Sequence, residues 1–257
     1  MKTITFKEHY FMIGLITLCL LTLYLPLAPV IIQSFRDPKS SDFTAMSYGE
    51  LFENFVIMNA LKTTLLIGIV VAFIAALLGL LASLAIRELG FPRTILLIVL
   101  TPLFIPGVSA GLASALLFKL LGIAPSILTI VIVQIIWALP FASLIILTVM
   151  TGFDPIFLEA AYDSGASRWR AFVDIELPLI QRGIAGAATF SFIISINETI
   201  RTSIVQGAWN TIPTYIWSNY KQVGLSPTLY ALMGSIILIT LFIVILSFFI
   251  TQRRDKN

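Results

Sequence analysis

Two side chains of opposite charge, Glu198 and Arg201, lie three residues apart inside a largely apolar stretch of the sequence. Ionisable groups within a membrane segment are costly and usually have a partner. A spacing of three places both on one face of a helix, where they could form a structural ion pair. In a second interpretation, Glu198 faces a translocation path and attracts a cationic solute, with Asn197 as a neutral hydrogen-bonding neighbour. Arg201 would then either neutralise Glu198 or favour an anion, and the sequence leaves these interpretations open.

A proline and a glycine, Pro106 and Gly107, interrupt another apolar stretch. Proline removes a backbone donor and leaves a carbonyl free, which a neighbouring helix, a water or a ligand must satisfy. A packing kink without any ligand is an equal alternative. Three aromatic residues of a later segment, Trp209, Tyr215 and Trp217, are also candidate solute contacts. Aromatic residues near a membrane–water interface are, however, more often interfacial anchors. Together with the charged pair and Asn197, these residues form the candidate substrate pathway.

A charged island, residues 152–182, separates two long apolar segments. Asp154-Pro155 is typical of a helix start, and Gly165 allows that helix to stop or another surface to approach. Ser167 can cap a second helical turn that carries Trp169. The composition fits either an amphipathic interfacial loop or a docking surface. The candidate docking residues are Glu159, Ala160, Ala161, Asp163, Gly165, Trp169, Leu177 and Pro178.

The sequence lacks the residues that catalysis or metal binding at membrane depth would require. Its single histidine, His9, and single cysteine, Cys19, provide neither a catalytic pair nor a metal cluster. It has no Gly-x-x-x-x-Gly-Lys-Ser/Thr loop to cradle phosphate. We therefore expect a chain that is not an enzyme and that binds no cofactor itself.

The composition predicts that membrane helices position these groups. Hydrophobic residues make up 58% of the 257 residues and charged residues only 11%, whereas a soluble domain carries about 25% charged residues. Six segments are long enough to cross a hydrocarbon core of about 30 Å. The expected fold is therefore an all-α membrane protein with six transmembrane helices. The segments are residues 10–32, 60–86, 94–121, 125–151, 183–205 and 229–251.

The distribution of positive charge favours an orientation with both termini in the cytoplasm. The formal net charge of +3 fits cationic cytoplasmic loops better than a nucleic-acid partner. The expected organisation is a first helix with its external loop (1–58), a five-helix core with the island on the cytoplasmic side (59–251), and a cytoplasmic tail (252–257). The cations placed inside are Lys2, Lys7, Arg87, Arg93, Arg168, Arg170, Arg182, Arg253, Arg254 and Lys256.

The island resembles the EAA loop of ABC importer permeases. Its residues run Glu159-Ala160-Ala161, three residues, Gly165, nine residues, Ile175, one residue and Leu177-Pro178, which matches the pattern without a gap. Further segments are similar to the spermidine/putrescine permease branch of the type I binding-protein-dependent importers. That branch often has an acidic pair late in the fifth helix, where this chain has Asn197-Glu198. The similar segments are 101–107, Pro140, 212–217 and 224–227.

The resemblance implies the type I permease fold, with the EAA loop forming a coupling helix that docks into a cytoplasmic ATP-binding subunit. It implies two such subunits, which bind the ATP and Mg. It also implies a second permease, expected to be a different homologous chain, and an external substrate-binding protein. The expected location is the bacterial cytoplasmic (inner) membrane, where the multi-pass chain contacts lipid.

The function expected from the resemblance is translocation of a small cation of the polyamine type, such as spermidine or putrescine. One alternative is an ABC permease for another solute, such as an aminophosphonate, an amino acid derivative or a metal ion. A second alternative is an ion-driven carrier or channel that works alone. It would account for the composition and for Glu198, but would leave the spacing of the island to chance.

Overall fold

The computed structural model describes residues 6–36 and 42–254, and these residues are almost entirely helical. Lys2 and Lys256 of the predicted orientation, and the last part of the predicted tail, lie outside the described residues. The chain divides into two compact units. One comprises residues 1–58 and 218–257, and the other comprises residues 59–217.

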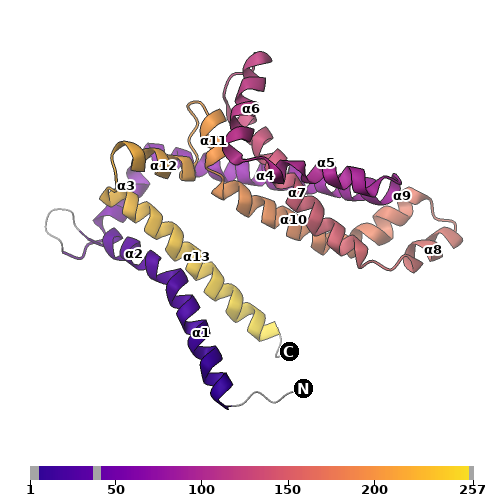
Figure 1. Cartoon of the computed structure of the whole chain (residues 1–257), viewed down its shortest axis with the longest axis horizontal. Helices are drawn as coiled ribbons and strands as arrows, with labels where there is room; N and C mark the ends of the chain where they lie inside the picture. Colours follow the sequence, from indigo (N-terminus) through magenta and orange to yellow (C-terminus); the bar gives the residue numbers. More distant parts are fainter. Residues whose placement is uncertain (1–5, 37–41, 255–257) are drawn as a thin grey trace. The chain divides into compact units, whose positions relative to one another are not determined.

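The first unit contains the two ends of the chain. Its helices are α1 (Phe6–Tyr24), a 3₁₀ turn (Leu25–Leu27), α2 (Ala28–Ser34), α3 (Met46–Glu53) and α13 (Pro227–Arg254). Helix α13 packs against α2 and α3 (Figure 1). A Cβ atom at Gly234 would lie 2.9 Å from the Ser34 hydroxyl oxygen and 3.0 Å from that of Tyr48. These two hydroxyls are hydrogen-bonded at 2.6 Å, so a glycine is needed where α13 crosses them.

The second unit contains most of the remaining helices. They begin with α4 (Phe55–Glu88), α5 (Pro92–Phe104), α6 (Gly107–Leu120) and α7 (Ile127–Thr151). The island follows as α8 (Ile156–Asp163), α9 (Arg168–Ala171) and a π-helical segment (Phe172–Glu176). Helices α10 (Leu177–Asn197), α11 (Ile200–Val205) and α12 (Ile212–Gln222) complete the series, with α12 running into the first unit.

Helix α7 is the central element of this second unit. It packs against α5, α6, α10 and α11, and its Ile130, Ala138 and Ile146 are fully buried. Small residues allow α4 and α10 to approach it closely. A Cβ at Gly79 would lie 2.9 Å from the Cβ of Ala142, and one at Gly183 would lie 2.8 Å from Val149. Such contacts are typical of helix pairs in membranes, where packing and not water exclusion drives association.

The structure interrupts two of the six expected segments. Four helical stretches in the described residues are long and apolar enough to cross a membrane, and α5 with α6 forms a further, bent pair. The bend between α5 and α6 is 101°, and Pro106, which has no N–H, lies at the junction. The expectation of one continuous helix over residues 183–205 is wrong, because α10 ends at Asn197 and α11 begins at Ile200. The sixth expected segment, residues 229–251, lies within the 28-residue helix α13.

Candidate functional site

The break between α10 and α11 is stabilised by the side chain of Glu198. The backbone at Glu198 is extended, with φ −76° and ψ 117°. Its Oε1 accepts a hydrogen bond from the backbone N–H of Arg201 at 2.9 Å, and its Oε2 accepts one from Arg201 Nη1 at 2.9 Å. The carboxylate therefore caps the start of α11 and forms an ion pair at the same time. Both of its oxygens are engaged.

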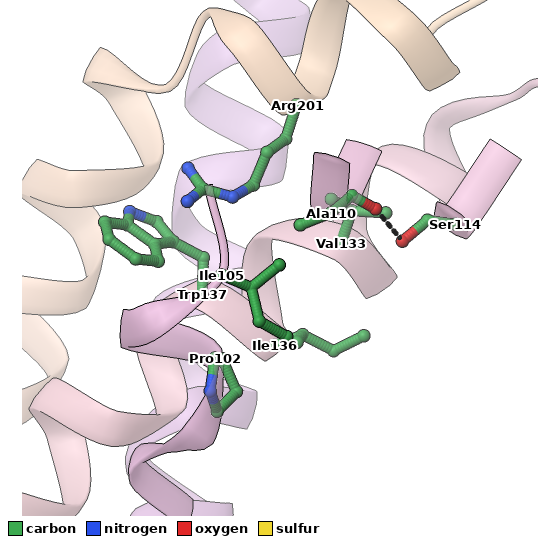
Figure 2. Close-up of a pocket in the computed structure, with 8 residues that line it drawn as sticks. All are labelled: Pro102, Ile105, Ala110, Ser114, Val133, Ile136, Trp137 and Arg201. Atoms are coloured by element: carbon green, nitrogen blue, oxygen red, sulfur yellow. Dashed lines mark hydrogen bonds between the residues drawn. The ribbon is translucent and has the colours of Figure 1, made fainter. Parts of the chain in front are cut away.

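Arg201 joins three helices at this point. Its guanidinium carbon lies 3.8 Å from the centroid of the Trp137 ring on α7, which is cation–π geometry. A Cβ at Gly107, the first residue of α6, would lie 3.3 Å from the guanidinium, so the glycine leaves room for it. Figure 2 shows Arg201 extending from α11 toward the Trp137 indole. Only 8% of Arg201 and 8% of Glu198 is exposed, so the pair is buried.

A small cavity of about 70 Å³ lies beside this pair. Pockets that hold a whole small-molecule ligand usually measure about 300–1,000 Å³. In this conformation the cavity is therefore too small to enclose a whole small-molecule ligand. Arg201 is the one charged residue in its lining, which is otherwise mainly apolar (Figure 2). The lining residues are Pro102, Ile105, Ala110, Ser114, Val133, Ile136, Trp137 and Arg201.

A buried hydrogen-bond network fixes the two sides of the α10–α11 break to α7. Gln134 Nε2 donates to the Thr202 hydroxyl on α11 at 2.8 Å, and the Ser195 hydroxyl on α10 donates to Gln134 Oε1. The Thr129 hydroxyl of α7 also donates to the Val205 carbonyl at the end of α11, at 2.8 Å. Polar side chains of α7 thus fix both sides of the break, and these buried groups find their partners within the protein, as apolar surroundings favour.

The structure brings together four of the residues predicted for the pathway. Pro106 and Gly107 lie at the α5–α6 bend, and the Gly107 backbone adjoins the Arg201 guanidinium that pairs with Glu198. Trp137 was not predicted as part of the site, because one aromatic residue in a continuous apolar segment has no distinguishing pattern. Its contact with Arg201 depends on tertiary packing.

The other predicted pathway residues lie elsewhere. Asn197 is exposed, and its side-chain Nδ2 donates to the Ile193 carbonyl of its own helix at 2.8 Å. Trp209 and Trp217 are each 47% exposed, and Tyr215 is partly buried on α12. None of these residues lines the cavity. Their roles in solute transport stay predictions.

The island forms two short helices joined by a tight turn. The Asp154 side chain accepts a hydrogen bond from the Ile156 N–H at 3.0 Å, at the start of α8. At the other end, Gly165 has φ +82°, and the N–H groups of Gly165 and Ala166 donate to the carbonyls of Tyr162 and Ala161. This arrangement is a Schellman motif, which requires a left-handed residue at the position of Gly165. Ser167 then caps α9 by accepting from the Arg170 N–H at 3.3 Å.

The predicted docking residues fall into exposed and anchored groups. Glu159 and Ala160 are exposed, and Trp169 is 73% exposed, although its ring contacts Phe172. Ala161 is buried, and Leu177 packs against the hydrophobic core. Asp163, Gly165 and Pro178 are exposed. Figure 1 shows α8 and α9 at the end of α10 opposite α11, so the docking candidates lie far from the charged pair.

Comparisons with known proteins agree on a family. Residues 65–256 match the family described as "Binding-protein-dependent transport system inner membrane component". The chain is 29% identical over 254 residues to the spermidine/putrescine transport system permease protein PotC of Escherichia coli (strain K12), covering 95% of each chain. It is 26% identical to the putrescine transport system permease protein PotI of the same strain, covering 91% of this chain and 88% of PotI.

Two further matches come from systems that carry other solutes. The sulfate transport system permease protein CysT of Escherichia coli (strain K12) is 27% identical over 214 residues, covering 77% of this chain and 75% of CysT. A crystal structure of a bacterial alginate ABC transporter, in complex with a periplasmic protein bound to an alginate pentasaccharide, contains a chain with a TM-score of 0.72. That chain is 20% identical, and the match covers 95% of this chain and 93% of that one. This likeness establishes the fold.

Proposed function

Because the chain belongs to the family of binding-protein-dependent transport system inner membrane components, we propose that it carries a polyamine, such as spermidine or putrescine, through an ABC importer. Membership of this family makes the chain a permease, which is a membrane transport subunit and not an enzyme. The polyamine proposal is supported by two polyamine permease relatives and by the buried acidic residue Glu198 beside a cavity-lining Arg201.

The ion pair sets the condition that a cationic solute must meet. Glu198 and Arg201 together carry no net charge, and both carboxylate oxygens already accept hydrogen bonds from Arg201. A solute ammonium group would therefore compete with the Arg201 guanidinium for Glu198 and for the face of Trp137. Exchange of one cation for another avoids leaving a bare carboxylate in an apolar site, which would be far more costly.

An anionic solute is the second candidate. The sulfate permease relative favours it, as does the position of Arg201 as the charged residue in the cavity lining. An anion would bind the Arg201 guanidinium directly and weaken its bond to Glu198. The two proposals make opposite predictions for the carboxylate, since a cation needs Glu198 and an anion is repelled by it.

ATP is handled by partner subunits under this proposal. The α8–α9 element, residues Ile156–Ala171, is the proposed coupling segment, and its exposed Glu159 and Trp169 would contact a cytoplasmic ATP-binding subunit. Two such subunits, a second permease of homologous sequence and an external solute-binding protein would complete the importer. Nucleotide binding would drive transport by favouring one of two membrane conformations over the other. Both termini would lie in the cytoplasm.

Uptake of labelled solutes into cells tests which solute the importer carries. Cells that express the full importer should take up labelled spermidine or putrescine, and Glu198→Gln should reduce this uptake far more than it reduces the amount of the protein in the membrane. Uptake of sulfate that Glu198→Gln leaves intact or increases would support the anionic candidate instead. Polyamine uptake that is unchanged in Glu198→Gln would assign Glu198 a purely structural role.

A further inference from the structure

A second ion pair lies at the other end of the unit, between Arg87 and Glu176. Arg87 is in the last turn of α4, and Glu176 is the last residue of the π-helical segment that leads into α10. Arg87 Nη1 donates to Glu176 Oε1, and Nη2 donates to Oε2 at 3.2 Å. The two terminal guanidinium nitrogens thus bind different carboxylate oxygens, which fixes the relative orientation of the two side chains in addition to attracting them.

The two partners differ in burial. Only 3% of the Glu176 side chain is exposed, against 33% of the Arg87 side chain. A buried carboxylate is costly unless a cation and hydrogen bonds compensate it. Arg87 also donates from Nε to Glu88 Oε1 at 2.9 Å, but Glu88 is exposed and contributes little. The energetically important contact of Arg87 is therefore the one that joins α4 to the start of α10.

Glu176 lies five residues after Ala171, the last residue of the proposed coupling segment. Residues 168–197 form one continuous helical stretch, in which the Leu177 N–H donates to the Phe172 carbonyl across a π turn. π turns are often found at functional sites. Phe172 and Leu177, which flank the turn, pack against the hydrophobic core of the unit. A displacement of α9 would thus reach α10 along the helix and would reach α4 through Glu176.

We propose that the Arg87–Glu176 pair holds the helix that continues from the coupling segment into α10 against α4, so that movement of the ATP-binding subunit shifts α4 and α10 together. This inference rests on the proposed coupling role of residues 156–171. The pair is a positioning contact, because neither side chain is expected to touch solute or nucleotide. A buried ion pair adds little stability over well-packed apolar side chains. A role in fixing how two helices move accounts for its presence better than stability does.

The double variant R87M/E176M separates positioning from stability. Methionine at both positions leaves no buried charge, so the variant should fold and assemble as the wild type does. The measurement is ATP hydrolysis by the purified, membrane-reconstituted importer, with and without its external binding protein carrying the solute with which it co-purifies. We expect the stimulation by the binding protein to fall at least fivefold, while the basal rate and the assembly are retained. E88Q, which removes only the exposed neighbour, is the matched control and should keep full stimulation.

R87K provides a second arm that does not depend on removing the pair. Lysine keeps the charge and the stability but cannot form the two-pronged contact, so stimulation should fall severalfold without a change in melting temperature. Wild-type stimulation in the assembled R87M/E176M importer would overturn the inference, as would wild-type stimulation in R87K if the double variant does not assemble. E159K, within the coupling segment, distinguishes failure of the ion-pair inference from failure of the proposed coupling role. If stimulation is lost in E159K but kept in R87M/E176M and R87K, the proposed function stands and the inference is rejected. If E159K keeps full stimulation, the coupling role of the segment is rejected as well.

Discussion

The guanidinium of Arg201 lies 3.8 Å from the centroid of the Trp137 ring while its Nη1 donates to Glu198 Oε2 at 2.9 Å. The chain thus places a cation of its own between a carboxylate and an aromatic face, which are the two groups that an alkylammonium solute would use. The bend before Gly107 and the break at Glu198 meet at this cation. A transport cycle that admits a cationic solute at this point must move Arg201.

Removal of Arg201 alone should destabilise the importer strongly. Arg201→Met leaves Glu198 buried without its counter-charge, and breaking a buried pair in this way costs about 3–5 kcal/mol. The double variant Glu198→Gln/Arg201→Met has no bare charge and should recover most of that loss. Thermal unfolding of the purified complex measures both. Equal melting temperatures for Arg201→Met and the wild type would show that the pair contributes nothing to stability.

A methyl group at Gly107 should disturb the same cation. The Cβ of Gly107→Ala would lie 3.3 Å from three guanidinium atoms of Arg201, so the guanidinium must shift or the bend must open. Overpacking of this kind costs about 1–3 kcal/mol. Gly186→Ala on α10 is the matched control, because its nearest heavy atom would be 3.7 Å away and alanine favours a helix. Thermal unfolding should show a loss for the first variant and no loss for the second, and a loss of equal size in both would contradict the packing argument.

The turn at Gly165 should depend on backbone conformation and not on space. Gly165 has φ +82°, and no atom would lie within 4 Å of an added Cβ. A β-branched residue in this left-handed region costs at least about 1–2 kcal/mol, whereas asparagine tolerates it. Gly165→Val should therefore reduce solute uptake much more than Gly165→Asn, with similar amounts of protein in the membrane. Equal uptake by the two variants would mean that the turn does not position the coupling segment.

Two buried serines of α10 should respond oppositely to alanine. The Ser195 hydroxyl donates to Gln134, so Ser195→Ala should cost about 0.6–1.7 kcal/mol, the range for hydrogen bonds between membrane helices. The Ser191 hydroxyl is fully buried and has no hydrogen-bond partner among the described residues. Ser191→Ala should therefore be neutral or slightly stabilising. Chemical or thermal unfolding of the complex distinguishes them, and a larger loss for Ser191→Ala would contradict the hydrogen-bond assignment.

Local sequence signals predicted the local structure of the island. The capping side chains Asp154 and Ser167 and the glycine at position 165 act on neighbouring backbone groups, so short stretches of sequence suffice to place them. The break at Pro106 is local for the same reason, since proline cannot donate. The all-helical membrane fold followed from composition, whereas the break within residues 183–205 did not.

Features that depend on distant residues were not predictable from such signals. The segment around Glu198 reads as a continuous apolar helix, yet it breaks where the Glu198 side chain caps α11 and Gln134 of α7 holds both sides. Trp137 acquires its role only through packing of α7 against α11. Arg87 and Glu176 are 89 residues apart, and only the fold brings them into contact.

ATP-dependent uptake into proteoliposomes tests the central claim most directly. The wild-type importer, reconstituted with its ATP-binding subunits and its external binding protein, is compared with Glu159→Lys, using labelled spermidine outside and ATP at the cytoplasmic face. We expect accumulation of spermidine by the wild type and none by an equally assembled Glu159→Lys importer. Spermidine accumulation that needs no ATP, or that is undiminished in Glu159→Lys, would contradict the account.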